Sequence, residues 1–258
     1  MRKLGITLTL LLLELTVLFA VSSEDTALLK QAEESTSFKD TDFAAEYTIV
    51  QSKPGQGQNA TYAVLYRRDK EETYTIVITG PDDDDKGKGY IQYNSSIWFF
   101  DPSDRKFTFT TKKDKVEGTN ATPADFTPQY YTRDYKIEKT EDVNLGNFKC
   151  TLFYLTAKTK NVTYSKVQLW VSKDDGLIRM KKDFSLSSQL LRTTAMPSYQ
   201  KINKRSVPVT ILIIDNLRGK KINNKMQYEK TQITINNVSF DKLKDVIFTK
   251  AYLQMINE

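Results

Sequence analysis

The chain has 258 residues, with 38 Lys and Arg against 32 Asp and Glu, a formal charge of +6 and no histidine. The lack of histidine excludes Ser-His and Cys-His catalytic arrangements and the commonest metal ligand. A single cysteine, Cys150, excludes an internal disulfide bond. The charge is mild and no nucleic-acid recognition motif is present, so we expect no nucleic-acid partner, no cofactor and no metal.

The first segment has the pattern of a signal peptide. Arg2 and Lys3 precede an apolar stretch over residues 6–21 that is too short to span a bilayer comfortably. Small residues at positions 20–22 predict cleavage after Ser22 or Ser23, which makes residues 1–22 a signal peptide and 23–258 one exported domain. No cysteine follows this segment, so we expect a mature chain that is not itself acylated. An uncleaved N-terminal anchor is the alternative.

The mature chain begins with a predicted helix and then changes to strands. Residues 24–36 carry a modest apolar stripe, with acidic residues at the start as the helix dipole prefers. Apolar and polar residues then alternate with a period of two, separated by turn residues such as Pro54-Gly55 and Gly80-Pro81. Six strands are predicted in this half: residues 43–49, 62–67, 73–79, 90–93, 97–101 and 106–111.

Residues 112–134 interrupt this pattern as a long connection with a short helix near Pro123–Phe126. A connection of this length in a compact domain is usually functional or mobile. Strands then resume over residues 135–143, 149–157, 163–171, 177–184, 190–199, 207–215 and 227–236. A short helix or turn and a tail follow in residues 240–253, and we expect about eleven strands in total.

So many strands joined by short turns predict a mainly β fold, an open or half-closed antiparallel β-barrel. A barrel this wide is not easily filled by its own side chains, so it closes over a helix or holds a ligand. Strand parity places seven apolar residues on the wall of an apolar cavity, although an ordinary core has the same pattern. These candidate ligand-binding residues are Tyr62, Val64, Tyr66, Ile76, Ile78, Trp98 and Phe100.

Four segments, taken in order, resemble the LolA-like family of outer-membrane lipoprotein-sorting proteins. Pro81 to Ile91 is similar to the family's turn and strand before an aromatic segment. The strand Ile97-Trp98-Phe99-Phe100-Asp101-Pro102 is similar to its aromatic strand that ends in Asp-Pro. Residues 167–174 are similar to a later strand and turn, and residues 248–253 to the closing tail.

The resemblance implies a half-open barrel with short helices as a lid over the cavity. It implies a non-enzymatic, monomeric carrier in the periplasm that moves the acyl chains of lipoproteins from an inner-membrane ABC transporter to an outer-membrane acceptor. The archetypal carriers hold the lid shut with an arginine on an early strand. Arg67 and Arg68 lie in that region, but the sequence does not single out either of them.

Three alternatives remain open at this point. The first is an envelope lipid sensor or assembly factor of the same fold that acts through a protein partner. The second is a secreted lipocalin-type binder of a small hydrophobic ligand. Five Asn-X-Ser/Thr sequences, at Asn59, Asn94, Asn120, Asn161 and Asn237, would suit it. The third is a hydrolase that uses two carboxylates, although the spacing of Asp and Glu singles out no pair.

Overall fold

The computed structural model describes residues 21–258 except 94–95, 117–118 and 161, so most of the predicted signal peptide lies outside the described residues. The described residues form one antiparallel sheet of thirteen strands, which equals the number of predicted segments and exceeds the expected total of about eleven. Each predicted strand segment is present. The strands are β1 Phe43–Lys53, β2 Gly57–Arg68, β3 Thr73–Gly80, β4 Gly89–Tyr93, β5 Ser96–Asp101, β6 Lys106–Thr110, β7 Tyr135–Leu145, β8 Phe148–Ala157, β9 Lys166–Ser172, β10 Ile178–Phe184, β11 Leu190–Ile202, β12 Arg205–Ile222 and β13 Lys225–Ser239.

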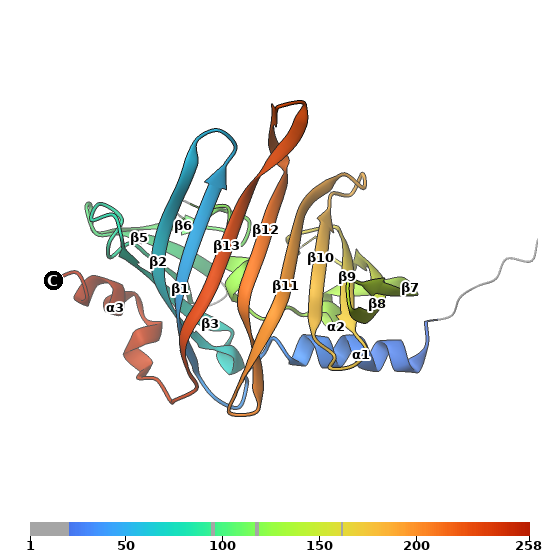
Figure 1. Cartoon of the computed structure of the whole chain (residues 1–258). Helices are drawn as coiled ribbons and strands as arrows, with labels where there is room; N and C mark the ends of the chain where they lie inside the picture. Colours follow the sequence, from blue (N-terminus) through green and yellow to red (C-terminus); the bar gives the residue numbers. More distant parts are fainter. Residues whose placement is uncertain (1–20, 94–95, 117–118, 161) are drawn as a thin grey trace, which may run out of the picture.

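The sheet consists of two meanders joined in the middle. Its order is β6-β5-β4-β3-β2-β1-β13-β12-β11-β10-β9-β8-β7, so the first and last strands pair with one another (Figure 1). Tyr47 of β1 lies opposite Ile235 of β13, and Ile49 lies opposite Ile233. This pairing leaves β6 and β7 as the two edges of the sheet. The mainly β, half-open architecture that the sequence predicts is therefore confirmed.

One face of the sheet, which we call the inner face, is covered by α1 and by the chain between β6 and β7. Helix α1 spans Ser23–Glu34, and Leu29 and Ala32 of this helix are buried against β8 and β9. Residues 111–134, which we call the crossing segment, contain the 3-10 helix η2 (Pro123–Phe126) and the short helix α2 (Tyr131–Asp134). We call α1 and the crossing segment together the lid.

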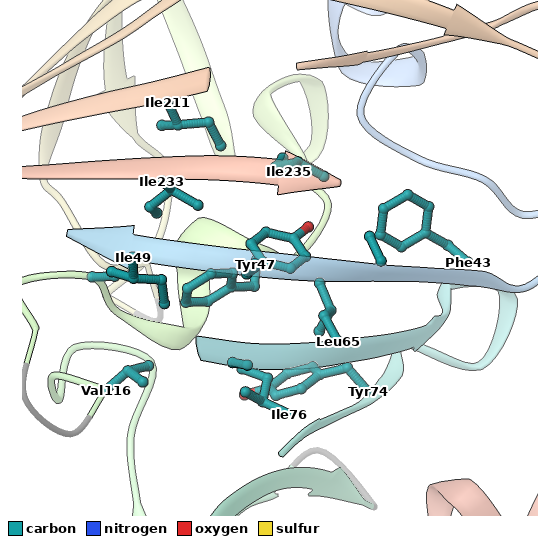
Figure 2. Close-up of a cluster of buried hydrophobic side chains, with 14 of the residues drawn as sticks. Phe43, Tyr47, Ile49, Leu65, Tyr74, Ile76, Val116, Ile211, Ile233 and Ile235 are labelled. Atoms are coloured by element: carbon teal, nitrogen blue, oxygen red, sulfur yellow. The ribbon is translucent and has the colours of Figure 1, made fainter. Parts of the chain in front are cut away.

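The main core lies on the inner face. Figure 2 shows buried side chains of β1, β2, β3, β12 and β13 gathered with Val116 of the crossing segment. The period-two pattern of β1 explains this burial, because Phe43, Ala45, Tyr47 and Ile49 are all buried while the residues between them are more exposed. A second cluster under α1 continues the core over β8, β9 and β10.

The outer face is covered only in part, by the C-terminal segment. The 3-10 helix η3 (Asp245–Phe248) and helix α3 (Lys250–Met255) lie at the opposite end of the sheet from α1 (Figure 1). Leu253 of α3 is fully buried against Val77, Ile91 and Phe100. A third short 3-10 helix, η1 (Asp69–Glu71), follows β2.

Two further observations concern single features of the chain. Cys150 is buried on the outer face of β8, as expected for a small apolar residue, and burial raises the pKa of its thiol. No helix in the described part of the chain is both long and apolar enough to cross a membrane.

Candidate ligand cavity

An apolar cavity of about 100 Å³ lies between the inner face and the lid. Its walls come from both halves of the sheet, since Phe43 and Tyr47 of β1 face Ile211 of β12 and Ile235 of β13. The lid contributes Phe126 of η2, whose ring packs edge-on against Tyr47 with centroids 5.3 Å apart. The arrangement suits an apolar ligand held by area contact with few polar groups.

The two parts of the lid are hydrogen-bonded to each other. The backbone N–H and the hydroxyl of Thr132 in α2 both donate to the Glu33 carboxylate in α1, each over 2.7 Å. The backbone N–H of Gln129 donates to the hydroxyl of Thr36, which follows α1. Helix α1 and the crossing segment are therefore linked to each other as well as to the sheet.

Arg67 of β2 connects the sheet to the end of α1. Its Nη2 donates to the backbone carbonyl of Thr36 over 2.9 Å, and its Nε donates to Asp69 over 2.9 Å. The guanidinium also lies over the rings of Phe38 and Phe43. The side chain is buried and lines the cavity. Such a contact holds the carbonyl end of α1 and the following turn against the inner face.

The neighbouring Arg68 points to the opposite side of the sheet. It bonds to Asp42 and Asp245 and to the carbonyl of Leu243, all outside the cavity. Between the two arginines that the sequence leaves open, only Arg67 bonds to the turn that follows helix α1 of the lid.

Arg192 of β11 makes a second connection, to the crossing segment. Its Nη2 donates to both carboxylate oxygens of Asp125 over 2.9 Å, and its Nη1 donates to the hydroxyl of Tyr164. Both partners of this ion pair are buried. Burial alone would raise the pKa of Asp125, but the charges of Arg192 and Lys181 hold it below its ordinary value.

A smaller pocket of about 70 Å³ lies beside the first, and Asp125, Tyr131 and Lys181 line both. Its other walls are more polar and include Asp183, Tyr135 and Tyr164. Burial raises the pKa of Tyr164 to about 12, so its hydroxyl stays neutral at ordinary pH. Within the described residues, no group of three or more acidic or cysteine side chains could hold a metal ion.

The structure separates the seven residues that strand parity placed on one wall. Ile76 and Ile78 of β3 lie in the main core on the inner face. Tyr66, Trp98 and Phe100 instead pack on the outer face beneath α3. Tyr62 is 44% exposed and Val64 is half-buried.

None of these seven residues lines the apolar cavity, so their role in ligand binding stays a prediction. The parity of β2 is the reverse of the expected one. Ala63 and Leu65 are the residues of this strand that face the core, and Tyr62, Val64 and Tyr66 face outward. Helix α3 buries the outer face at this point, so the outward-facing positions of β2 and β5 also carry aromatic residues. Their sequence pattern therefore resembles that of a cavity wall.

Sequence reasoning also missed the charged side chains of the site. The sequence analysis does not single out Lys181, Asp183 or Arg192, because charged residues are almost never fully buried unless they are paired. The structure buries all three beneath the crossing segment. The period of two that Arg192 shares with the apolar residue Met196 on β11 was too weak a signal to find them.

Comparison with known proteins supports the same fold. A sequence profile of a family described as "Uncharacterized protein" matches residues 70–255. No curated protein matches the sequence.

Several solved structures are similar over nearly their whole length. A LolA superfamily protein from Nitrosomonas europaea shares 21% identity, with 90% of this chain and 100% of that one covered and a TM-score of 0.73. A domain from Vibrio parahaemolyticus described as outer membrane lipoprotein-sorting shares 13% identity over 88% and 97% of the chains, with a TM-score of 0.73. A DUF1329 family protein from Desulfovibrio piger shares 18% identity over 89% and 98%, also with a TM-score of 0.73.

Proposed function

Because the chain belongs to the family described as "Uncharacterized protein" and has the fold of the LolA superfamily, we propose that it is a non-enzymatic carrier of lipoprotein acyl chains or another lipid. The observation that supports this proposal is the apolar cavity between the inner face and a lid that arginines hold in place. The carrier works in the periplasm as a monomer, after removal of residues 1–22.

The lid has to move for an acyl chain to enter. The cavity of about 100 Å³ is smaller than the ~150 Å³ cavity that takes up one benzene molecule, so it cannot hold a whole acyl chain. Opening separates Phe126 and Thr36 from the inner face and enlarges the apolar space. Arg67 and Arg192 then determine how easily the empty protein opens.

The energies of opening and binding are of similar size. Separating a buried ion pair such as Arg192–Asp125 costs about 3–5 kcal/mol if one charge stays buried without its partner. Each methylene removed from water contributes about 0.8 kcal/mol, so burial of about four to six methylenes offsets the separation of this pair. A long acyl chain can therefore hold the lid open, whereas a short one cannot.

The direction of transport is part of the proposal. The domain of Vibrio parahaemolyticus is described as outer membrane lipoprotein-sorting. By analogy, this chain receives its cargo from an inner-membrane ABC transporter and delivers it to an outer-membrane acceptor. A sensor or assembly role of the same fold remains the outcome to be expected if no lipid is carried.

The lipocalin-type alternative is not retained. Lipocalin barrels are closed by eight strands, whereas β6 and β7 are separate edges of this sheet over the described residues. Among the five Asn-X-Ser/Thr sequences that would suit this alternative, Asn94 and Asn161 lie outside the described residues. Asn120 is buried and bonded to Glu229, which makes it a poor acceptor in the folded chain.

The test is native mass spectrometry of the mature protein purified gently from its own envelope, with extraction of bound lipid. A co-purifying acylated protein or lipid is the expected result. A protein that is empty and also takes up no acylated peptide in vitro would contradict the carrier proposal. Hydrolysis of an ester by the pure protein would contradict its non-enzymatic part.

Two neighbouring residues of β12 provide a matched pair of variants. Ile211 lines the cavity and is 8% exposed, while Leu212 faces outward and is 38% exposed. We expect Ile211→Glu to abolish lipid uptake and Leu212→Glu to leave it unchanged. Circular dichroism of both variants checks that they fold, and equal uptake by the two folded variants would place the lipid elsewhere.

A further inference from the structure

Four polar residues form a compact patch in the middle of the inner face. Lys181 and Asp183 of β10 lie directly opposite Thr194 and Arg192 of β11, so the four side chains occupy two adjacent cross-strand pairs. Each is at most 9% exposed. The patch lies between the apolar clusters of the sheet, where polar side chains are costly to bury.

Several polar atoms of this patch lack hydrogen-bond partners among the described residues. They are both carboxylate oxygens of Asp183, the hydroxyl of Thr194 and the Nε of Arg192. Asp183 is fully buried and forms an ion pair with Lys181, whose ammonium lies 3.3 Å from Oδ2. Buried polar groups are nearly always satisfied in native proteins, so these atoms call for an explanation.

The patch stands where the two pockets meet. Lys181 lines both pockets, Thr194 lines only the apolar one, and Asp183 lines only the polar one. A ligand with an apolar tail and a small polar head can therefore place its tail against Ile211 and its head against Asp183. The polar pocket of about 70 Å³ has room for several water-sized groups.

The charges around the patch indicate the kind of head group. Lys181 and Arg192 carry positive charge, and Asp125 and Asp183 carry negative charge when ionised, so the four together are neutral. The carboxylate of Asp183 would repel an anionic head group, and the ammonium of Lys181 would repel a cationic one. A neutral head group avoids both repulsions. It can donate a hydrogen bond to the Asp183 oxygens and accept one from the ammonium.

We propose that Asp183 and Lys181 bind the neutral polar head of the carried lipid, a hydroxyl or amide donor close to an ester-linked acyl chain. The hydroxyl or amide donates to Asp183, the ester carbonyl accepts from Lys181, and the acyl chain lies in the apolar cavity. This subsite rests on the proposed carrier function and adds the class of head group. Acylglycerols and the acylated amino terminus of a lipoprotein both have this chemistry.

The test measures how well unlabelled lipids displace a fluorescent acyl probe from the full mature protein. Three unlabelled lipids are compared. Monooleoylglycerol has two hydroxyl groups, methyl oleate has no hydrogen-bond donor, and a triacylated cysteine peptide has an amide donor. We expect monooleoylglycerol to bind about tenfold or more tightly than methyl oleate, as one hydrogen bond to a charged group implies. Tighter binding of the triacylated peptide than of monooleoylglycerol would identify a lipoprotein as the source of the head.

The variants Asp183→Leu and Thr194→Val show whether the patch causes this preference. Asp183→Leu should lose the preference and bind the two oleoyl lipids with equal affinity. Thr194→Val keeps the shape of the side chain but removes its hydroxyl, and it should reduce the preference for monooleoylglycerol in part. This variant tests the patch independently if Asp183→Leu fails to fold.

Three outcomes would overturn the inference. Equal affinity of the unaltered protein for the two oleoyl lipids would show that the patch binds water only. An unchanged preference in folded Asp183→Leu would place the head elsewhere. No binding of any lipid would instead overturn the carrier function on which the subsite rests.

Discussion

Nη2 of Arg192 donates to both carboxylate oxygens of Asp125, each over 2.9 Å, and so joins strand β11 to the crossing segment. The two residues lie 67 positions apart in the chain. Their ion pair is buried, whereas most ion pairs on this protein have at least one exposed partner. The pair is therefore an electrostatic contact between the sheet and η2 of the lid that solvent screens little.

Replacement of Asp125 tests the role of this pair. Asp125→Asn leaves the Arg192 charge buried without its partner, so we expect the free energy of unfolding to fall by about 3–5 kcal/mol. We also expect lipid uptake to become faster, because the lid opens more easily. Urea denaturation and stopped-flow uptake of a fluorescent lipid measure the two effects.

Arg205→Ala is the matched control for this experiment. Arg205 pairs with Asp40, whose side chain is 72% exposed, and exposed pairs contribute at most about 1 kcal/mol. A loss of stability in this variant as large as that in Asp125→Asn would argue that burial of the Asp125–Arg192 pair has no special role.

Asp125 and Asp183 should respond to pH in opposite directions. The pKa of Asp125 is lowered in the fold, so its contribution to stability is present above the unfolded pKa of about 3.9 and lost as the pH falls through the folded value. Burial raises the pKa of Asp183, so the folded state holds this proton more tightly than the unfolded state. Asp183 therefore lowers stability as the pH rises through its raised pKa.

The variant Asp183→Asn isolates the second effect. We expect it to remove part of the decline in stability as the pH rises from about 4, the ordinary value for an aspartate, toward neutrality. Urea midpoints at several pH values between 4 and 8 measure this difference. Parallel curves for the variant and the unaltered protein would show that Asp183 does not change its protonation in this range.

Gly89 and Leu253 form a close contact between the sheet and the C-terminal helix. A Cβ atom at Gly89 would lie 2.5 Å from Cδ2 of Leu253 and 2.9 Å from the carbonyl oxygen of Ile76. We expect Gly89→Ala to cost about 1–3 kcal/mol through overpacking and Leu253→Ala to cost about 2–5 kcal/mol through a cavity. Because the two residues touch, the double variant should lose less than the sum of these costs.

A double-mutant cycle by thermal and urea denaturation measures this coupling. Additive losses would mean that the Ile76 carbonyl, rather than Leu253, resists a side chain at position 89. The cycle therefore tests whether α3 is fixed to the outer face by this contact.

Ser22 caps the first helix of the lid. Its hydroxyl accepts a hydrogen bond from the backbone N–H of Asp25 over 2.9 Å, and α1 begins at Ser23. We expect a protein that begins at Ser22 to be about 1 kcal/mol more stable than one that begins at Ser23, because the latter has lost the cap. Thermal denaturation of the two proteins measures the difference, and equal midpoints would indicate that the end of α1 does not contribute to stability.

The sequence by itself determined the type and order of the secondary structure. The period-two pattern of residues such as Phe43, Tyr47 and Ile49 depends only on alternation across a strand, and the turns depend on local residue preferences. Pro123 likewise marks the start of η2, which has the expected bounds. The aromatic strand ending in Asp101 also carried the resemblance to the LolA-like fold.

Only the tertiary structure decided which face of each strand lines the cavity. In β3, Ile76 faces the core while its neighbour Val77 is buried by α3, so burial on both faces hides the parity. The same covering helix made Trp98 and Phe100 resemble an inner wall. The burial of Asp125 and Arg192 could not be predicted from the sequence either. A charged residue is buried only where the folded chain places an oppositely charged partner against it, and these two residues are far apart in the sequence.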